Sequence, residues 1–82
     1  MSLIPIDYFR VRHHLELPHA GHFADGAAVT AGQQQVKKID YDTDTGFYLV
    51  LSHDGTVFHI PREAAAFHVV KADAKKAAAV LR

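Results

Sequence analysis

Residues 35–61, QVKKIDYDTDTGFYLVLSHDGTVFHIP, predict three consecutive antiparallel strands, and both connecting segments have sequences typical of hairpin turns. Asp54-Gly55 lies between two apolar runs, and this pair is typical of a two-residue hairpin turn because Asp tolerates and Gly prefers positive φ. Residues 42–46 predict a second, longer hairpin loop in which Gly46 takes a left-handed conformation. The segment therefore predicts a three-stranded meander.

The two turns also predict the register of the meander. A two-residue loop at 54–55 pairs Leu51 with Phe58, and an odd loop at 42–46 pairs Tyr41 with Phe47. The side chains predicted to face the core are Phe47, Leu49, Leu51, Phe58 and Ile60. The other face, predicted to be wet or partly covered, carries Tyr48, Val50, Ser52, Val57 and His59.

The N-terminal part predicts one long strand followed by a loop. Residues 7–17 alternate between apolar and polar side chains, which is typical of a half-buried strand, and Pro18 ends the pattern. His13 falls on the apolar side and is predicted to be a core histidine with a hydrogen-bonded neutral ring. Residues 18–34 hold three of the five glycines and predict a long loop, anchored by Phe23, in which residues 27–30 could form a short edge strand.

Residues 61–82 are rich in alanine and lysine and predict one or two helices. Pro61 suits a first helical turn, and Asp73 suits the N-cap of a separate final helix. A single helical stripe would carry Phe67, Val70, Ala74, Ala77 and Leu81. The alternative for residues 67–71 is a fourth strand, because His68-Val69-Val70 is rich in β-branching.

These elements predict an α+β fold in one small domain covering residues 1–82. The N-terminal strand and the meander would form an antiparallel sheet covered by the C-terminal helices. Residues 1–3 resemble a remnant of expression cloning and are left out of the fold prediction. The alternative architecture is a small SH3-like barrel, which a strand at residues 67–71 would favour.

Over its second half the sequence is similar to the small KTSC domain. The similarity rests on the run IDYD, an apolar strand, a glycine turn, an aromatic strand, and a proline before an alanine-rich segment. The Lys-Thr-Ser-Cys motif of that family is absent, so the resemblance implies no residue roles.

Composition sets limits on the function. Nine basic and nine acidic side chains cancel, so no global field favours nucleic acid or membranes, and a binding site of that kind would be a local patch. There is no cysteine, which excludes disulfides and thiolate metal sites. The sequence has neither a run long enough for a membrane helix nor the features of a secretory signal, so the expected compartment is the cytoplasm.

Two local patches suggest binding chemistry. Four of the seven histidines fall within ten residues, and His14, His19 and His22 are the candidate ligands of a metal such as zinc or nickel, with Glu16 and Asp25 the only nearby carboxylates. The outward face of the first strand would carry Tyr8, Arg10, Arg12 and His14, a basic and aromatic set suited to a single-stranded nucleic acid.

No motif indicates catalysis. Ser52-His53-Asp54 holds the residue types of a triad, but three consecutive residues at a strand end cannot hydrogen-bond in series.

The favoured interpretation is a non-catalytic interaction module without a cofactor. It would bind a protein partner, or a second copy of itself as a homodimer, through a sheet edge. Nucleic-acid binding and histidine-mediated metal binding are the alternatives.

Overall fold

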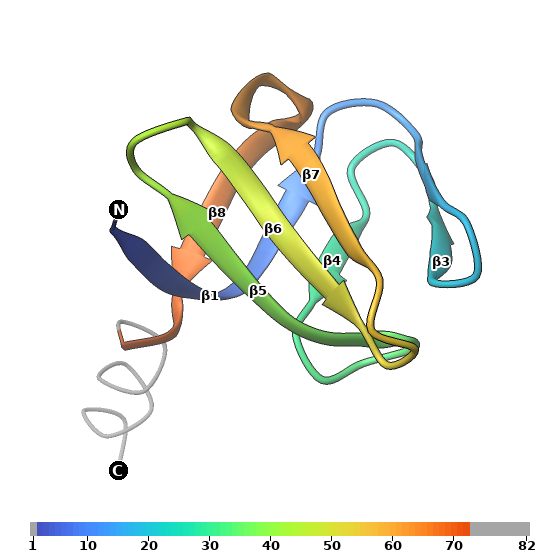
Figure 1. The fold of residues 1–82 in the computed structure, drawn as a ribbon. Helices are drawn as coiled ribbons and strands as arrows, with labels where there is room; N and C mark the ends of the chain where they lie inside the picture. The colour runs from blue at the N-terminus through green and yellow to red at the C-terminus, as the bar shows by residue number, and fades with distance from the viewer. Residues whose placement is uncertain (1, 73–82) are drawn as a thin grey trace, which may run out of the picture.

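The computed structural model describes residues 2–72 and shows an almost entirely β architecture (Figure 1). Eight strands and one short 3-10 helix follow one another along this part of the chain. Their bounds are β1 Leu3–Val11, β2 Leu15–Leu17, β3 Gly21–Phe23, β4 Ala28–Thr30, β5 Val36–Asp42, β6 Phe47–Ser52, β7 Val57–Pro61, η1 Arg62–Ala64 and β8 Ala65–Val70.

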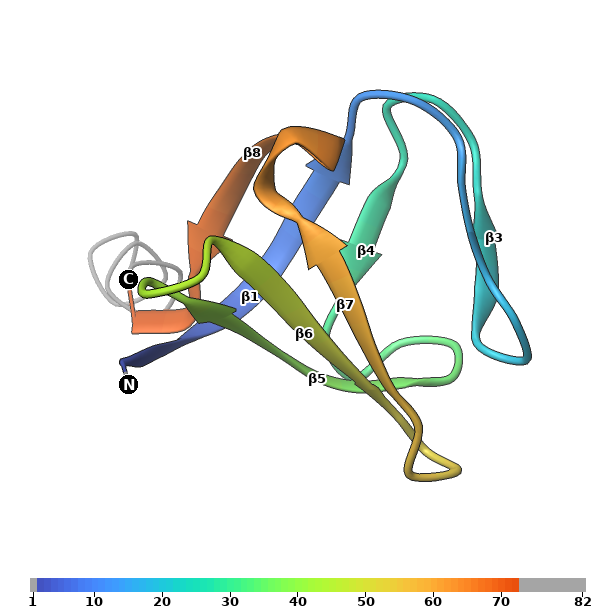
Figure 2. The same cartoon turned by 45° about the horizontal axis from the view of Figure 1, so that its top comes forward.

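Six of the strands form one antiparallel sheet with β1 at its centre. The order is β4-β1-β5-β6-β7, and β8 also pairs with β1. The N-terminal part of β1 pairs with β5, whereas its C-terminal part pairs with β4 and β8. Because β1 changes partners along its length, β8, β1 and β4 lie behind β5, β6 and β7 and cross them (Figures 1 and 2).

The prediction of an α+β fold is wrong. Residues 65–70 form β8, which is antiparallel to β1 with Phe9 opposite His68, and Pro61 ends β7 instead of opening a long helix. Pairing with β1 satisfies the backbone groups along one edge of residues 65–70, so tertiary contacts override the helical propensity of the alanines. A strand at residues 67–71 is the feature that, in the sequence analysis, favours the small SH3-like barrel over the sheet covered by helices. The final helix predicted from Asp73 lies outside the described residues.

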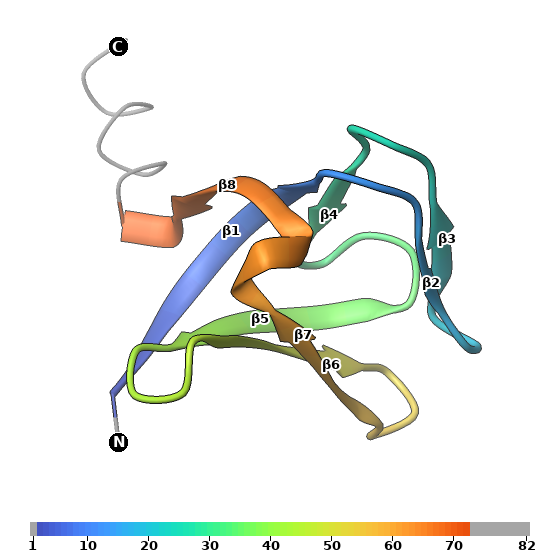
Figure 3. The ribbon, with the colours of Figure 1, turned by 90° about the horizontal axis from the view of Figure 1, so that it is seen from above.

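The long N-terminal strand is shorter and the following loop more structured than predicted. β1 ends at Val11, and residues 12–14, all exposed, form a bend before β2. The predicted loop at residues 18–34 contains β3 and β4, and β4 includes much of the short edge strand expected at 27–30. The β2–β3 hairpin stands beside the main sheet as a separate two-stranded unit (Figure 3). Leu3, which the fold prediction left out, begins β1 opposite Asp42.

The meander is present as β5, β6 and β7, but its predicted register is wrong by one residue. Val50, not Leu51, lies opposite Phe58, and Tyr48, not Phe47, lies opposite Tyr41. The loop between β5 and β6 holds four residues. The loop between β6 and β7 holds three residues, among them Gly55 with φ +94°. A one-residue change in loop length turns every side chain of a strand to the opposite face.

The core consequently takes the face of β6 that was predicted to be outside. Tyr48 and Val50 are buried, while Phe47 is exposed. Their neighbours in the buried cluster come from β1, β5, β7 and the hairpin, among them Ile6, Phe9, Ile39, Ile60, Leu17 and Phe23. His13 is exposed in the bend after β1, so the predicted core histidine is also wrong.

Candidate functional site

The outer face of the main sheet carries several exposed apolar side chains. Pairing across β1, β5, β6 and β7 aligns its side chains in rows. One row is Leu3, Asp42, Phe47, Pro61; the next is Pro5, Asp40, Leu49, His59; the third is Lys38, Leu51, Val57. Among residues 2–72 the exposed large hydrophobic side chains are Leu3, Phe47, Val57 and Phe67, so three of these four lie on this face. We call these three rows the outer face.

The outer face contains a shallow hollow and ends at a free strand edge. The hollow has a volume of about 360 Å³ and is lined by Asp42, Thr45, Phe47, Leu49 and His59. Strand β7 pairs only with β6 among the described strands. Ser52 donates its backbone N–H to the Thr56 carbonyl, so antiparallel alternation directs the backbone groups of Val57 and His59 away from β6. Pro61 then ends this edge without an N–H.

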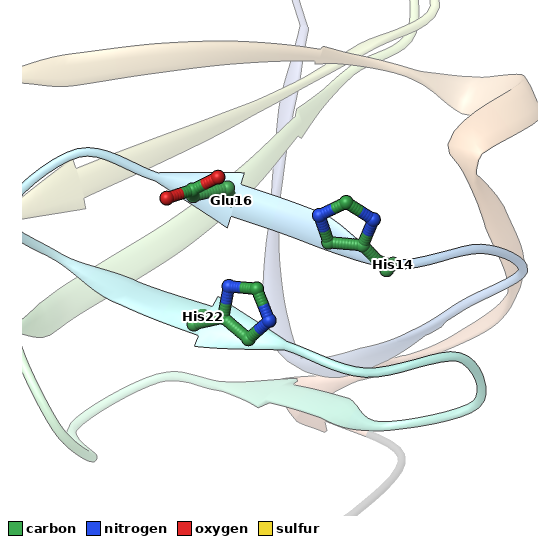
Figure 4. A group of neighbouring side chains, drawn as sticks. All are labelled: His14, Glu16 and His22. Atoms are coloured by element: carbon green, nitrogen blue, oxygen red, sulfur yellow. The ribbon is translucent and has the colours of Figure 1, made fainter.

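A second feature is a cluster of possible metal ligands on the β2–β3 hairpin, formed by His14, Glu16 and His22 (Figure 4). Glu16 lies directly opposite His22 in the register, and His14 precedes Glu16 by two residues, so all three point to the same side. The alternate side chains Leu17 and Phe23 are buried in the core. The hairpin is therefore fixed by its apolar side and presents the three ligands to solvent.

The metal-ligand set expected from the sequence is only partly brought together. His14 and His22 are neighbours, with ring centroids 5.1 Å apart. His19 is in the hairpin loop with φ +64° and does not belong to the cluster, in which Glu16 is the third member. Asp25 is exposed in a later turn and does not belong to it either.

The basic and aromatic set is divided between two places. Tyr8, half-buried on β1, has the Arg10 guanidinium 5.9 Å from its ring centre and contacts Phe67 edge-on. Arg10 also donates from Nη1 to the Gly26 carbonyl, and Arg12 donates from Nε to the Ala65 carbonyl. His14 lies apart from them on the hairpin.

An open hollow of about 820 Å³ lies beside β8. Its lining includes Arg12, Arg62, Glu63 and Phe67, together with Tyr48 and His68. The Tyr48 hydroxyl and His68 Nδ1 are hydrogen-bonded at 2.7 Å. Burial raises the pKa of Tyr48, and the neighbouring Tyr41 raises it further, while Arg62 acts in the opposite direction. These groups form a structural contact between β6 and β8 that is reachable from the hollow.

Ser52, His53 and Asp54 do not form a catalytic triad. The Ser52 hydroxyl donates to Asp54 Oδ1, and the Thr56 backbone N–H donates to the same oxygen. These two hydrogen bonds, in that order, lower the pKa of Asp54 to about 2. His53 is exposed and donates its backbone N–H to Gln35, so the carboxylate stabilises the turn and orients no imidazole.

No protein-family model matches this sequence, and neither a curated protein nor a solved structure matches it. In the part of the chain that the structure describes, no helix is long and apolar enough to span a lipid bilayer. The functional argument therefore rests on the surfaces described above.

Proposed function

We propose that this chain is a non-catalytic protein-interaction module that self-associates through the outer face. The observation that carries the proposal is the gathering of Leu3, Phe47 and Val57 on one face of the sheet, all exposed. Scattered exposed hydrophobic residues are ordinary, but a contiguous apolar patch is typical of an interaction surface. The hollow beside Phe47 provides a place for an apolar side chain of the partner to insert.

The face, more than the edge of β7, provides the contact area. Edge pairing could use the outward backbone groups of only Val57 and His59 before Pro61 ends the strand. Three rows of side chains across four strands cover on the order of 400 Å² of sheet, given the usual strand spacing and rise. A standard interface buries about 800 Å² on each partner, so we expect a weak association.

A second copy of the chain is the proposed occupant. The outer face is a sheet surface with only a shallow hollow, and two sheet surfaces pack well face to face about 10 Å apart. Its Lys38 and Asp40 already pair with each other at 3.5 Å, so this ion pair demands no oppositely charged partner. A two-fold dimer is the commonest symmetric assembly and would bury the same three rows of side chains on both copies. The cytoplasm is the proposed compartment. A chain without cysteine has no disulfide that its reducing conditions could break.

Sedimentation velocity over a wide concentration series tests the proposal. We expect the wild-type chain to shift from monomer to dimer as its concentration rises, and Phe47→Lys to remain monomeric because it places a charge in the interface. Phe67→Lys is the matched control, since Phe67 is comparably exposed but lies on β8. It should dimerise like the wild type.

A wild-type chain that stays monomeric throughout, or equal effects of the two lysine substitutions, would refute self-association through this face. Nucleic-acid binding is the alternative function. The open hollow beside β8, whose lining includes Arg12 and Phe67, is the feature that would bind the nucleic acid. It would appear as salt-sensitive binding of a single-stranded oligonucleotide by the monomer, lost when Arg10→Ala and Arg12→Ala are combined.

A further inference from the structure

We infer that the β2–β3 hairpin carries a binding site for a divalent transition-metal ion, Zn²⁺ in the first place, formed by His14, Glu16 and His22. This site is independent of the outer face, because the hairpin is a separate two-stranded unit beside the main sheet (Figures 3 and 4). Its ligands are two imidazoles and one carboxylate.

The distances suit metal binding after small side-chain movements. One ligand atom from each residue can be chosen so that all three lie within 4.8 Å of one another. Tetrahedral zinc with bonds of about 2.1 Å would need these atoms about 3.4 Å apart. All three side chains are exposed, so rotation about their side-chain torsions can close the difference without moving the backbone.

The backbone beneath the ligands is held in place. Glu16 and His22 are directly paired, while Leu17 and Phe23 on the opposite side of the same strands are buried. Gly21 allows this close packing, because a Cβ atom there would lie 2.8 Å from the Phe23 ring. Two of the three ligands are therefore preorganised by a cross-strand pair, and the third follows from the alternation of side chains along the strand.

Competing interactions are weak. Among residues 2–72 the side chains of His14, Glu16 and His22 make no hydrogen bond or ion pair, and the one contact between them is that of the two imidazole rings. Binding would not have to break an existing polar network. Two nitrogens and one oxygen suit borderline ions such as zinc, nickel and copper better than calcium or magnesium, which prefer oxygen ligands alone. Solvent would complete the coordination.

Isothermal titration of the untagged full-length chain with zinc chloride tests the site. We expect one zinc ion per chain, at least tenfold weaker binding in His22→Ala and in Glu16→Gln, and reversal by a chelator. Titration with Co²⁺ should give a visible absorption spectrum that His22→Ala abolishes. Circular dichroism should be unchanged, because both substituted side chains are exposed.

His13→Ala and His19→Ala are the matched controls. Both imidazoles are exposed and close in sequence, but neither belongs to the cluster. They should bind zinc as the wild type does. The site would be refuted if zinc did not bind, if the control substitutions weakened binding as much as His22→Ala, or if one zinc ion were shared by two chains.

Discussion

Asp54 shows how a single side chain supports the hairpin between β6 and β7. Hydrogen bonds from Ser52 and Thr56 lower its pKa from 3.8 to about 2. A carboxylate whose pKa is lower in the folded state stabilises the fold above its unfolded pKa, and this stabilisation disappears as the pH falls through the folded value. The charge of Asp54 thus contributes at neutral pH and stops contributing in strong acid.

We predict that Asp54→Asn lowers the melting temperature at neutral pH. The difference from the wild type should shrink as the pH falls from 3.8 towards 2, because the wild-type carboxylate then becomes neutral too. Thermal unfolding at a series of pH values measures this. Asp25→Asn, at an exposed turn position, is the control. A difference that stays constant over the whole acidic range would contradict the assignment.

At the residue scale, the sequence identified two members of the hairpin cluster but not the reason they meet. Pro18 follows the end of a strand, as predicted, because β2 ends at Leu17, but the chain then forms a tight loop that brings Gly21 back opposite Leu17. If residues 18–20 are recognised as the hairpin loop, counting outward from the loop places Glu16 opposite His22. The register predicted from Asp54-Gly55 places Tyr48 on the outer side, whereas the structure buries it, with its hydroxyl hydrogen-bonded to His68 twenty residues away.

At the scale of elements, β6 shows where pattern-based prediction fails. Its sequence FYLVLS is apolar on both sides, so alternation does not tell which side is buried. The strand β7 has a more polar outer side at His59, and its inward residues Phe58 and Ile60 were predicted correctly. For β8, the spacing of Phe67 and Val70 fits a helix, and only the long-range pairing with β1 makes it a strand.

The hairpin formed by β2 and β3 should be sensitive to substitution at its tightest point. In Gly21→Ala the new Cβ atom would lie 2.8 Å from the buried Phe23 ring and 2.7 Å from Gln34 Oε1. The Gln34 side chain can move away, but the ring is packed in the core. Overpacking of this kind costs about 1–3 kcal/mol.

We predict faster amide hydrogen exchange in residues 15–23 and weaker zinc binding for Gly21→Ala. Gly26→Ala is the comparison, because its Cβ would meet nothing within 4 Å although φ is +78°. It should lose only about 1 kcal/mol for its left-handed conformation and keep normal zinc binding. Equal effects of both substitutions on the hairpin would contradict the close packing at Gly21.

At the scale of the whole molecule, one aromatic cluster joins the two halves of the bent sheet. The Tyr48 ring on β6 stacks on Phe9 of β1 with centroids 4.6 Å apart, and its hydroxyl is hydrogen-bonded to His68 of β8. Tyr41 of β5 packs against both Tyr48 and His68. Strands β1, β5, β6 and β8 thus meet at one side chain.

We therefore predict that Tyr48→Phe lowers the free energy of unfolding by about 1–2 kcal/mol, because the ring stack survives while His68 Nδ1 loses its partner. Urea unfolding should show a lower midpoint with an unchanged slope. Tyr41→Phe is the control, since no hydrogen bond holds its hydroxyl among residues 2–72, and it should be nearly neutral.

The raised pKa of Tyr48 adds a second test. The stabilisation linked to it is complete below the ordinary tyrosine pKa of about 10 and is lost as the pH rises through the higher folded value. The wild type should therefore lose more stability in alkali than Tyr48→Phe, and parallel losses would contradict the burial of this hydroxyl.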